Sequence, residues 1–260
     1  MVLCLRNLYL SPPKGISMRN IAKNLVKKIV KWPPQPAMTI DNLYGYLDAI
    51  WHKRDIDGPV VEIGVATGGT TTLACRFLSR IECKKQYFCV DTFGGFVQEQ
   101  LQSDHDLGLT KDHDKLFSDN SMERVRGDLA KWGIESNVNF IQADICKARP
   151  EDLPDDISVC LLDVDLRDPI YDGLKVLHGK LADGGIILVD DCKDGTSWVG
   201  ANVGYHDFVT EMGLEPKYYM GFGVVEKASC ESKQVPWSMT SQPNRISADF
   251  YGPAPQKKSA

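Results

Sequence analysis

Two short stretches decide the fold, PVVEIGVATGGTTT at residues 59–72 and YFCVD at residues 87–91. The β-branched run from Val60 to Val65 is typical of a buried parallel strand, and Thr70 to Leu78 is predicted to form the helix that follows. The glycines between them force a tight turn, where backbone N–H groups and the positive end of a helix can meet a ligand. The sequence therefore predicts a nucleotide-binding strand, turn and helix.

The spacing of the glycines indicates which class of nucleotide the turn binds. A dinucleotide site has the pattern G-x-G-x-x-G, whereas here Gly64 is followed only at Gly68 and Gly69, and the acidic Glu62 comes before them. The next strand ends at Asp91, whose carboxylate can accept both hydroxyls of an adenosyl ribose. The pattern E-x-G-x-A-x-G-G resembles the first motif of class I S-adenosylmethionine (SAM) methyltransferases. That resemblance implies a cofactor site containing Glu62, Gly64, Ala66, Gly68, Gly69 and Asp91.

Length and composition restrict the class of protein. The 260 residues can hold one α/β domain with a short appendage, and the net charge of −5 argues against a nucleic-acid substrate. Eight cysteines without a C-x-x-C pair suggest a reducing, cytoplasmic location. The apolar start of the chain is broken by Arg6 and Asn7, so we expect no signal peptide and no membrane span.

We expect three regions along the chain. Residues 1–57 contain two amphipathic helices that could cap the cofactor cleft or form a homodimer contact. Residues 58–228 alternate strand and helix, which predicts a doubly wound, Rossmann-like parallel sheet that closes with an antiparallel edge hairpin at residues 218–220 and 222–226. Further strands are expected at residues 138–142, 157–162 and 186–189, the last of them after a turn at residues 183–185. Within this SAM-binding catalytic domain, residues 98–114 are expected to form a mobile substrate lid. Residues 229–260 read as a polar C-terminal tail.

Several acids follow the predicted strands. Since ligands bind outside the carboxyl ends of such strands, these side chains are expected at one rim of the sheet, and they are Glu62, Asp91, Asp144, Asp163 and Asp190. An acid at the position of Asp144 commonly faces the adenine amino group in class I methyltransferases. The alternative for Asp144 is a helix N-cap.

Three of the carboxylates suggest a metal site. Asp163 and the pair Asp190 and Asp191 are separated by one crossover, so they are expected on adjacent strands. Carboxylates that converge without counter-charges repel one another, and a hard divalent cation with oxygen ligands, best Mg²⁺, would remove the repulsion. The alternative is an acidic rim without a metal.

Longer motifs make the resemblance specific. The segments DTFGGF (91–96), DVDLRDP (163–169), LADGG (181–185) and VDD (189–191) resemble those of the macrocin-type O-methyltransferases, metal- and SAM-dependent enzymes that methylate sugar hydroxyls on natural products. The resemblance implies Asp163, Asp190 and Asp191 as metal ligands, Asp165 as the general base, and Thr92, Phe93, Asp144 and Asp163 as further cofactor residues. Arg167 stands where the family usually has tyrosine, and the first 57 residues carry no matching motif.

The leading hypothesis is a Mg²⁺- and SAM-dependent O-methyltransferase acting on a small sugar or natural-product hydroxyl. Asp165 would accept the proton of that hydroxyl, with His206 as the alternative base. A catechol-type mechanism is disfavoured because Leu166 stands where those enzymes place a lysine base. An NAD-dependent oxidoreductase would need a dinucleotide motif that is missing from the sequence, and a non-catalytic SAM-binding protein is the third hypothesis.

Overall fold

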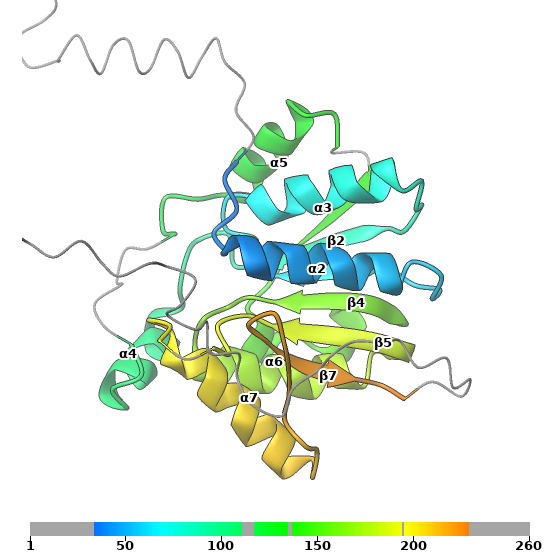
Figure 1. The fold of residues 1–260 in the computed structure, drawn as a ribbon. Coiled ribbons are helices and arrows are strands. Elements are labelled where there is room, and N and C mark those ends of the chain that lie inside the picture. The colour runs from blue at the N-terminus through cyan, green and yellow to red at the C-terminus, as the bar shows by residue number, and fades with distance from the viewer. Residues whose placement is uncertain (1–33, 111–116, 135–136, 194, 229–260) are drawn as a thin grey trace, which may run out of the picture. The chain divides into compact units, whose positions relative to one another are not determined.

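The computed structural model describes residues 34–110, 117–134, 137–193 and 195–228. These residues form a sheet of seven strands in the order β3-β2-β1-β4-β5-β7-β6 (Figure 1). The strands are β1 (Val60–Ile63), β2 (Tyr87–Asp91), β3 (Val138–Gln142), β4 (Ile157–Leu162), β5 (Leu181–Val189), β6 (Lys217–Tyr219) and β7 (Phe222–Glu226).

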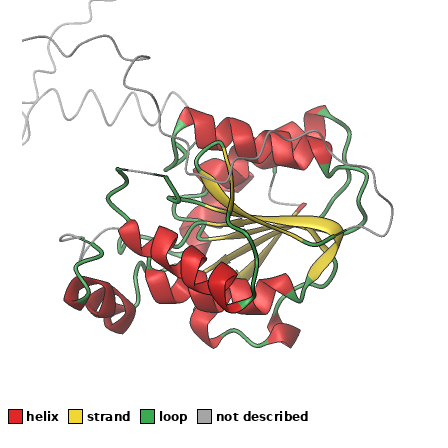
Figure 2. Ribbon diagram, turned by 60° about the horizontal axis from the view of Figure 1, so that its bottom comes forward, coloured by secondary structure: helices red, strands yellow, loops and turns green. Residues whose placement is uncertain are grey.

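Helices cover both faces of the sheet. On one face lie α2 (Ile40–His52), α3 (Gly69–Arg80) and α5 (Met122–Ala130), and on the other lie α6 (Arg167–His178) and α7 (Val199–Glu211). The short helix α4 (Gln98–Asp106) packs against α6. Figure 2 shows the strands between the two helical layers. The predicted doubly wound α/β fold is therefore confirmed.

The apolar runs form strands because both of their faces are covered. Every residue of β1 and β4 is buried, as is typical of a parallel strand between two helical layers. Since successive side chains point to opposite faces, Val61 and Ile63 join the core beneath α6 and α7, while Val60 joins the core beneath α2 and α3. This alternation makes two hydrophobic cores from one sheet.

The edge hairpin is also confirmed. The strand β7 pairs antiparallel with β5, and β6 pairs antiparallel with β7 on its outer side. The last strand in the sequence thus lies inside the sheet, between β5 and β6. Its last residue, Glu226, forms a 2.5 Å ion pair with the buried Lys53, just after α2.

One boundary was predicted wrongly. Residues 183–185 were expected to form a turn before the fifth strand, but they lie within β5. The register between β4 and β5 shifts at Ile157, and a Cβ at Gly185 would lie 2.4 Å from the carbonyl oxygen of Ile157. The glycine therefore lets two backbones approach at an irregular point of the sheet, which has the same residue signature as a turn.

The structure describes only parts of the predicted N-terminal region, lid and C-terminal tail. The helix α2 packs against α3 and β4 and buries Tyr46, Ala49 and Ile50. Residues 98–106 of the predicted lid form α4, and residues 111–116 lie outside the described chain. The same holds for the first predicted helix, within residues 1–33, and for the tail from residue 229. None of the helices in the described segments is long and apolar enough to cross a membrane.

Candidate active site

A cavity of about 310 Å³ lies at the carboxyl ends of five parallel strands. Its wall includes one residue that follows or ends each of them, namely Gly64, Asp91, Asp144, Asp163 and Asp190. Ligands bind at this edge in open parallel sheets. The structure therefore brings together four of the five acids that the sequence placed at the rim.

Glycines shape the turn after β1. Gly64 has φ of 88°, and a Cβ there would lie 1.8 Å from the carbonyl oxygen of Asp163. Gly68 caps α3 in the left-handed conformation, and a Cβ at Gly69 would lie 2.2 Å from the carbonyl oxygen of Gln35. Of these three glycines, Gly64 lines the cavity. Gly68 and Gly69, also predicted to contact the cofactor, are not among the residues that line the cavity, and they shape the turn and its close approach to the chain before α2.

Asp91 fixes the glycine turn from the next strand. Its Oδ2 accepts hydrogen bonds from the backbone N–H groups of Val65 (2.6 Å) and Ala66 (3.1 Å), and its Oδ1 accepts one from Phe93 (2.6 Å). Asp91, Ala66 and Thr92 line the cavity, whereas Phe93 is buried beside it. Oδ2 therefore already accepts two hydrogen bonds, and Oδ1, which also lies 3.4 Å from Thr92 Oγ1, keeps the remaining acceptor capacity.

Glu62 lies behind the turn and not in the cavity wall. Its Oε2 accepts hydrogen bonds from the hydroxyls of Thr71 (2.6 Å) and Tyr87 (2.5 Å). Burial raises the pKa of Glu62 to about 7, and these two hydrogen bonds limit the rise. The carboxylate that the sequence assigned to the cofactor thus connects β1 to α3 and β2.

Asp144 has the N-cap role that was the alternative to an adenine contact, and it also faces the cavity. It is the N-cap of a short 3₁₀ helix, Ile145–Lys147, and its Oδ1 accepts hydrogen bonds from Cys146 N (3.1 Å) and Gln100 Nε2 (3.0 Å). Its Oδ2 is buried and accepts no hydrogen bond from the described residues, although Lys147 Nζ lies 3.3 Å away. Asp144 lines the cavity. An acceptor in this state suits a ligand N–H group.

Four further aspartates that follow β4 and β5 also line the cavity, namely Asp163, Asp165, Asp190 and Asp191. Burial, and then repulsion from the neighbouring carboxylates, raises the pKa values of Asp163 and Asp165 well above the ordinary range. The same causes raise the pKa of Asp190 to about 6. Because a buried negative charge is costly, this part of the cavity favours a positively charged ligand.

The chemistry of these donors suits a divalent cation, but their positions are set by other contacts. Asn42 Nδ2 donates to Asp190 Oδ1, and Thr196 Oγ1 donates to Asp191 Oδ1 at 2.6 Å. Within the part of the chain that the structure describes, no group of three or more His, Cys, Asp or Glu side chains is arranged to hold a metal ion. Oxygen ligands of this type are those that Mg²⁺ prefers.

Asp165 is placed by a strained turn. Leu166 N donates to Val164 O at 2.6 Å, which closes a three-residue turn around Asp165, whose φ is 63°. Asp191 also has positive φ, 56°. Such backbone conformations cost roughly 1–3 kcal/mol each and cluster at functional sites. Two of the four carboxylates are thus presented to the cavity by unfavourable backbone geometry.

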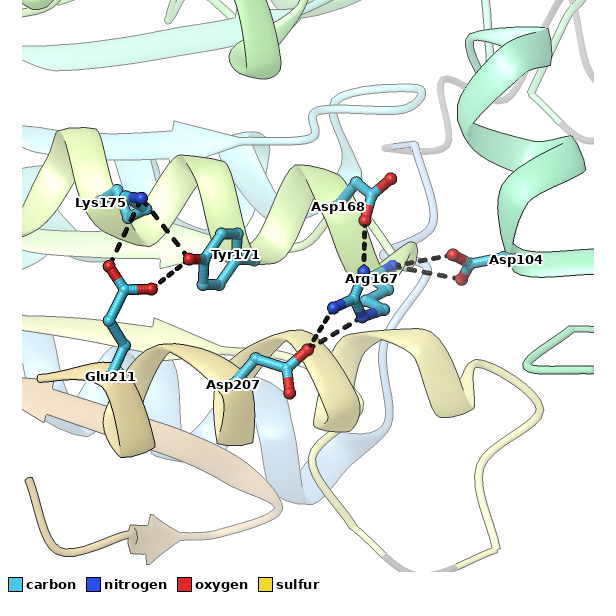
Figure 3. Close-up of polar contacts among 7 residues, drawn as sticks. All are labelled: Asp104, Arg167, Asp168, Tyr171, Lys175, Asp207 and Glu211. Atoms are coloured by element: carbon cyan, nitrogen blue, oxygen red, sulfur yellow. Dashed lines mark hydrogen bonds and ion pairs between the residues drawn. The ribbon is translucent and has the colours of Figure 1, made fainter. Parts of the chain in front are cut away.

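The alternative base, His206, is not brought to the cavity. It lies on α7, and its Nε2 is 2.6 Å from the hydroxyl of Tyr218 on β6. It is not among the residues that line the cavity. Arg167, where the family pattern has tyrosine, also turns away, and its guanidinium pairs with Asp207 on α7 and with Asp168 (Figure 3).

Sequence reasoning missed several residues of the cavity wall. Asn42 at the start of α2 reaches Asp190, and Lys193 Nζ lies 3.2 Å from Asn42 Oδ1. An aromatic pair, Phe96 and Trp198, has ring centroids 5.2 Å apart. These contacts join positions about 100 to 150 residues apart, so no local spacing could have indicated them.

The strand order, the glycine turn and the acid at the end of β2 together define a class I methyltransferase. The family model described as macrocin-O-methyltransferase (TylF) matches residues 23–215, and the chain belongs to this family. It is therefore an O-methyltransferase that uses SAM. Because the match begins at residue 23, it covers part of the region before residue 58 that showed no family motif.

Relatives and solved structures agree with this assignment. A Streptomyces olivaceus protein, 8-demethyl-8-(2,3-dimethoxy-alpha-L-rhamnosyl)-tetracenomycin-C 4'-O-methyltransferase, is 24% identical over 183 residues, which are 66% of this chain and 69% of the relative. The O-methyltransferase NovP is similar in fold, with a TM-score of 0.61 and 18% identity over 76% of this chain and 84% of its own. The calicheamicin methyltransferase CalS11 has a TM-score of 0.56 and 16% identity over 81% of this chain and 93% of its own.

Proposed function

We propose that this enzyme methylates a hydroxyl of a sugar or sugar-bearing natural product. The observation that carries the proposal is the single cavity wall that has Asp91 and Asp144 together with four further aspartates. The printed name of the Streptomyces olivaceus relative, which describes a rhamnosyl 4'-O-methyltransferase, supports this acceptor class. An NAD-dependent oxidoreductase and a non-catalytic SAM-binding protein are not supported by the family assignment.

We assign the cofactor to the side of Asp91. Asp91 would accept hydrogen bonds from the ribose hydroxyls of SAM, and Asp144 Oδ2 would accept one from the adenine amino group. Gly64 and Ala66 would contact the methionine part of SAM. Thr92 and Asp163 complete this set within the cavity wall. The positive charge of the sulfonium fits the aspartate side of the cavity, because opposite charges attract strongly where water is excluded. Glu62, Gly68, Gly69 and Phe93 would support the turn from behind.

Asp165 is the proposed general base. The acceptor hydroxyl loses its proton to the carboxylate of Asp165, its oxygen attacks the methyl carbon, and the carbon–sulfur bond breaks with its electron pair staying on sulfur. Burial and repulsion from the neighbouring acids raise the pKa of Asp165, and a cation held by those acids would offset the repulsion. A positioned base contributes roughly 10²- to 10⁴-fold to such a step. The position of His206 against Tyr218 gives no support for its use as the base.

We also propose dependence on Mg²⁺, held by Asp163, Asp190 and Asp191. When bound, such an ion would lower the pKa of a coordinated hydroxyl. The support is the oxygen-only donor set and the repulsion among its members. Asn42 and Thr196 donate only to Oδ1 of Asp190 and Asp191, so these two contacts leave Oδ2 of each carboxylate for a cation.

The test combines binding with turnover. S-adenosylhomocysteine binding is measured by calorimetry on the wild type and on Asp91→Asn, which we expect to bind at least about tenfold more weakly, because charge-assisted hydrogen bonds are worth roughly 1.5–3 kcal/mol. Transfer of labelled methyl from SAM is then followed on a panel of glycosylated acceptors that includes a rhamnosyl tetracenomycin. Equal binding by Asp91→Asn would refute the assigned cofactor position.

The base and the metal have separate tests. Asp165→Asn should lower kcat by about 10² or more and leave S-adenosylhomocysteine binding within a few-fold of wild type. Full turnover in EDTA, or by Asp191→Asn, would contradict the metal proposal alone. The three-region organisation, a homodimer through residues 1–57, a cytoplasmic location and the absence of nucleic-acid partners stay predictions. Sedimentation of a variant that lacks residues 1–33 tests the dimer.

A further inference from the structure

The helix α4 carries a buried carboxylate that the mechanism above does not use. Asp104 is 1% exposed, and both of its oxygens lie within hydrogen-bond distance of the backbone nitrogen of Arg167, at 3.3 and 3.1 Å. Figure 3 shows Asp104 reaching from α4 to the first residue of α6. The N-cap residue of α6 is Leu166, whose side chain makes no capping hydrogen bond. Asp104 therefore caps α6 from a different helix.

A third helix is built around this contact. A Cβ at Gly200, in the first turn of α7, would lie 2.0 Å from Asp104 Oδ2 and 2.8 Å from Arg167 N. Any larger residue at position 200 would therefore displace the carboxylate. Asp104 also lies near the N-terminal ends of both α6 and α7, where a negative charge is favoured by the helix dipoles. The contact is thus fixed by three elements.

The same face of α4 reaches the cofactor side of the cavity. Gln100 precedes Asp104 by four residues, so the two side chains lie on one face of the helix. Gln100 lines the cavity and donates a hydrogen bond of 3.0 Å to Asp144 Oδ1. This leaves Asp144 Oδ2 as the buried acceptor without a hydrogen bond from the described chain. Together with Cys146 N, which donates to the same oxygen, Gln100 orients that acceptor, so its orientation depends in part on where α4 is held.

We infer that Asp104 is a positioning residue for cofactor binding: it anchors α4 on the N-terminus of α6 so that Gln100 can orient Asp144 toward the adenine. This inference rests on the proposed position of the cofactor. It assigns residues 98–106 a fixed place in the cavity wall, in contrast to the mobile lid expected from the sequence.

The test is a double-mutant cycle read by calorimetry with S-adenosylhomocysteine. We expect Gln100→Ala and Asp104→Ala each to weaken binding about five- to tenfold, which is the loss of roughly one hydrogen bond. The double variant should bind no more weakly than Gln100→Ala alone, because Asp104 acts through Gln100. Additive losses would overturn the inference, since a general structural role would add to the loss at Gln100.

Conservative and matched variants complete the design. Asp104→Asn keeps an oxygen that can accept from Arg167 N, so it should bind within about twofold of wild type, whereas a loss as large as that of Asp104→Ala would overturn the inference. Glu99→Ala, exposed on the same helix, is the control and should bind as wild type. Hydrogen exchange should show a faster Arg167 amide in Asp104→Ala, and an unchanged rate would count against the cap.

A second route covers the case in which Asp104→Ala does not fold. Gly200→Ala keeps the carboxylate but displaces it, so it should reproduce the loss and its non-additivity with Gln100→Ala. Unchanged binding by Gly200→Ala would overturn the inference. The result for Asp91→Asn separates a failure of this inference from a failure of the proposed function. If Asp91→Asn binds weakly while Asp104→Ala binds normally, only the role of Asp104 is wrong. If Asp91→Asn binds normally, the assigned cofactor position itself is wrong.

Discussion

Replacing Glu62 with glutamine should change the pH dependence of folding stability. The carboxyl group is 1% exposed, and burial raises its pKa from an ordinary value of 4.5 to about 7. The groups that face it are the hydroxyls of Thr71 and Tyr87, which lower its pKa, and Asp91, which raises it. Since the folded state holds the proton more tightly than the unfolded state, ionisation of Glu62 costs stability.

The sign and size follow from proton linkage. The site contributes its full stability below about pH 4.5, and this contribution is lost as the pH rises through 7, because folding then requires the buried group to stay protonated or to be charged in the core. At about 1.4 kcal/mol per pKa unit, the loss approaches roughly 3 kcal/mol at high pH, and about 2.5 kcal/mol of it falls between pH 5 and pH 8.

Urea unfolding at pH 5 and pH 8 measures this effect in wild type and in Glu62→Gln. The variant lacks the titrating group, so relative to wild type it should gain about 2–3 kcal/mol on going from pH 5 to pH 8. Any cost of placing an amide beside Thr71 and Tyr87 is the same at both pH values and cancels in this comparison. Glu123→Gln, on the exposed face of α5, is the matched control. Parallel pH profiles for wild type and Glu62→Gln would refute the reasoning.

Two further predictions concern the frame of the site. Gly64→Ala should destabilise the fold by roughly 3 kcal/mol or more, because a Cβ there would lie 1.8 Å from a backbone oxygen. The control Gly127→Ala, on α5 with open space around it, should stabilise the fold by about 0.5–1 kcal/mol. Thermal unfolding of the two variants measures both effects. Lys53→Met should cost about 2–4 kcal/mol, since the buried Lys53 pairs with Glu226, while Lys131→Ala in a surface pair should cost at most about 1 kcal/mol in urea unfolding. A cost for Lys53→Met as small as the surface value would show that the pair adds nothing to the sheet edge.

The sequence predicted the parts of the fold that local pattern encodes. The strands over 138–142, 157–162 and 222–226 have the predicted bounds, because their apolar or β-branched runs are bordered by polar residues and pack into the cores. The start of β5 was wrong, since a glycine pair serves a close backbone approach as well as a turn. Residues 98–114 were expected to form a mobile substrate lid because the sequence is polar, and residues 98–106 of this segment form α4. Its one buried carboxylate is explained only by the distant N-terminus of α6.

The sequence also predicted part of the candidate active site. The acids at the strand ends reached the cavity because parallel strands bring their carboxyl ends to one edge. Glu62 does not line the cavity, because its side chain lies between β1 and α3 and accepts a hydrogen bond from Thr71. His206 was a candidate only through its place in the sequence, and its side chain contacts Tyr218 on β6 and does not line the cavity. The direction of a side chain depends on tertiary packing, which the local sequence pattern does not determine.

The place of β7 between β5 and β6 also bears on how the protein is made. During synthesis β5 emerges long before the strand that pairs with its outer edge, so a growing chain presents unpaired N–H and C=O groups along β5. Such an edge is a template for pairing with other chains. The sheet can be completed only once Glu226 has left the ribosome and can reach Lys53. Nascent chains stalled before that residue therefore present an unpaired β5 edge that can pair with other chains.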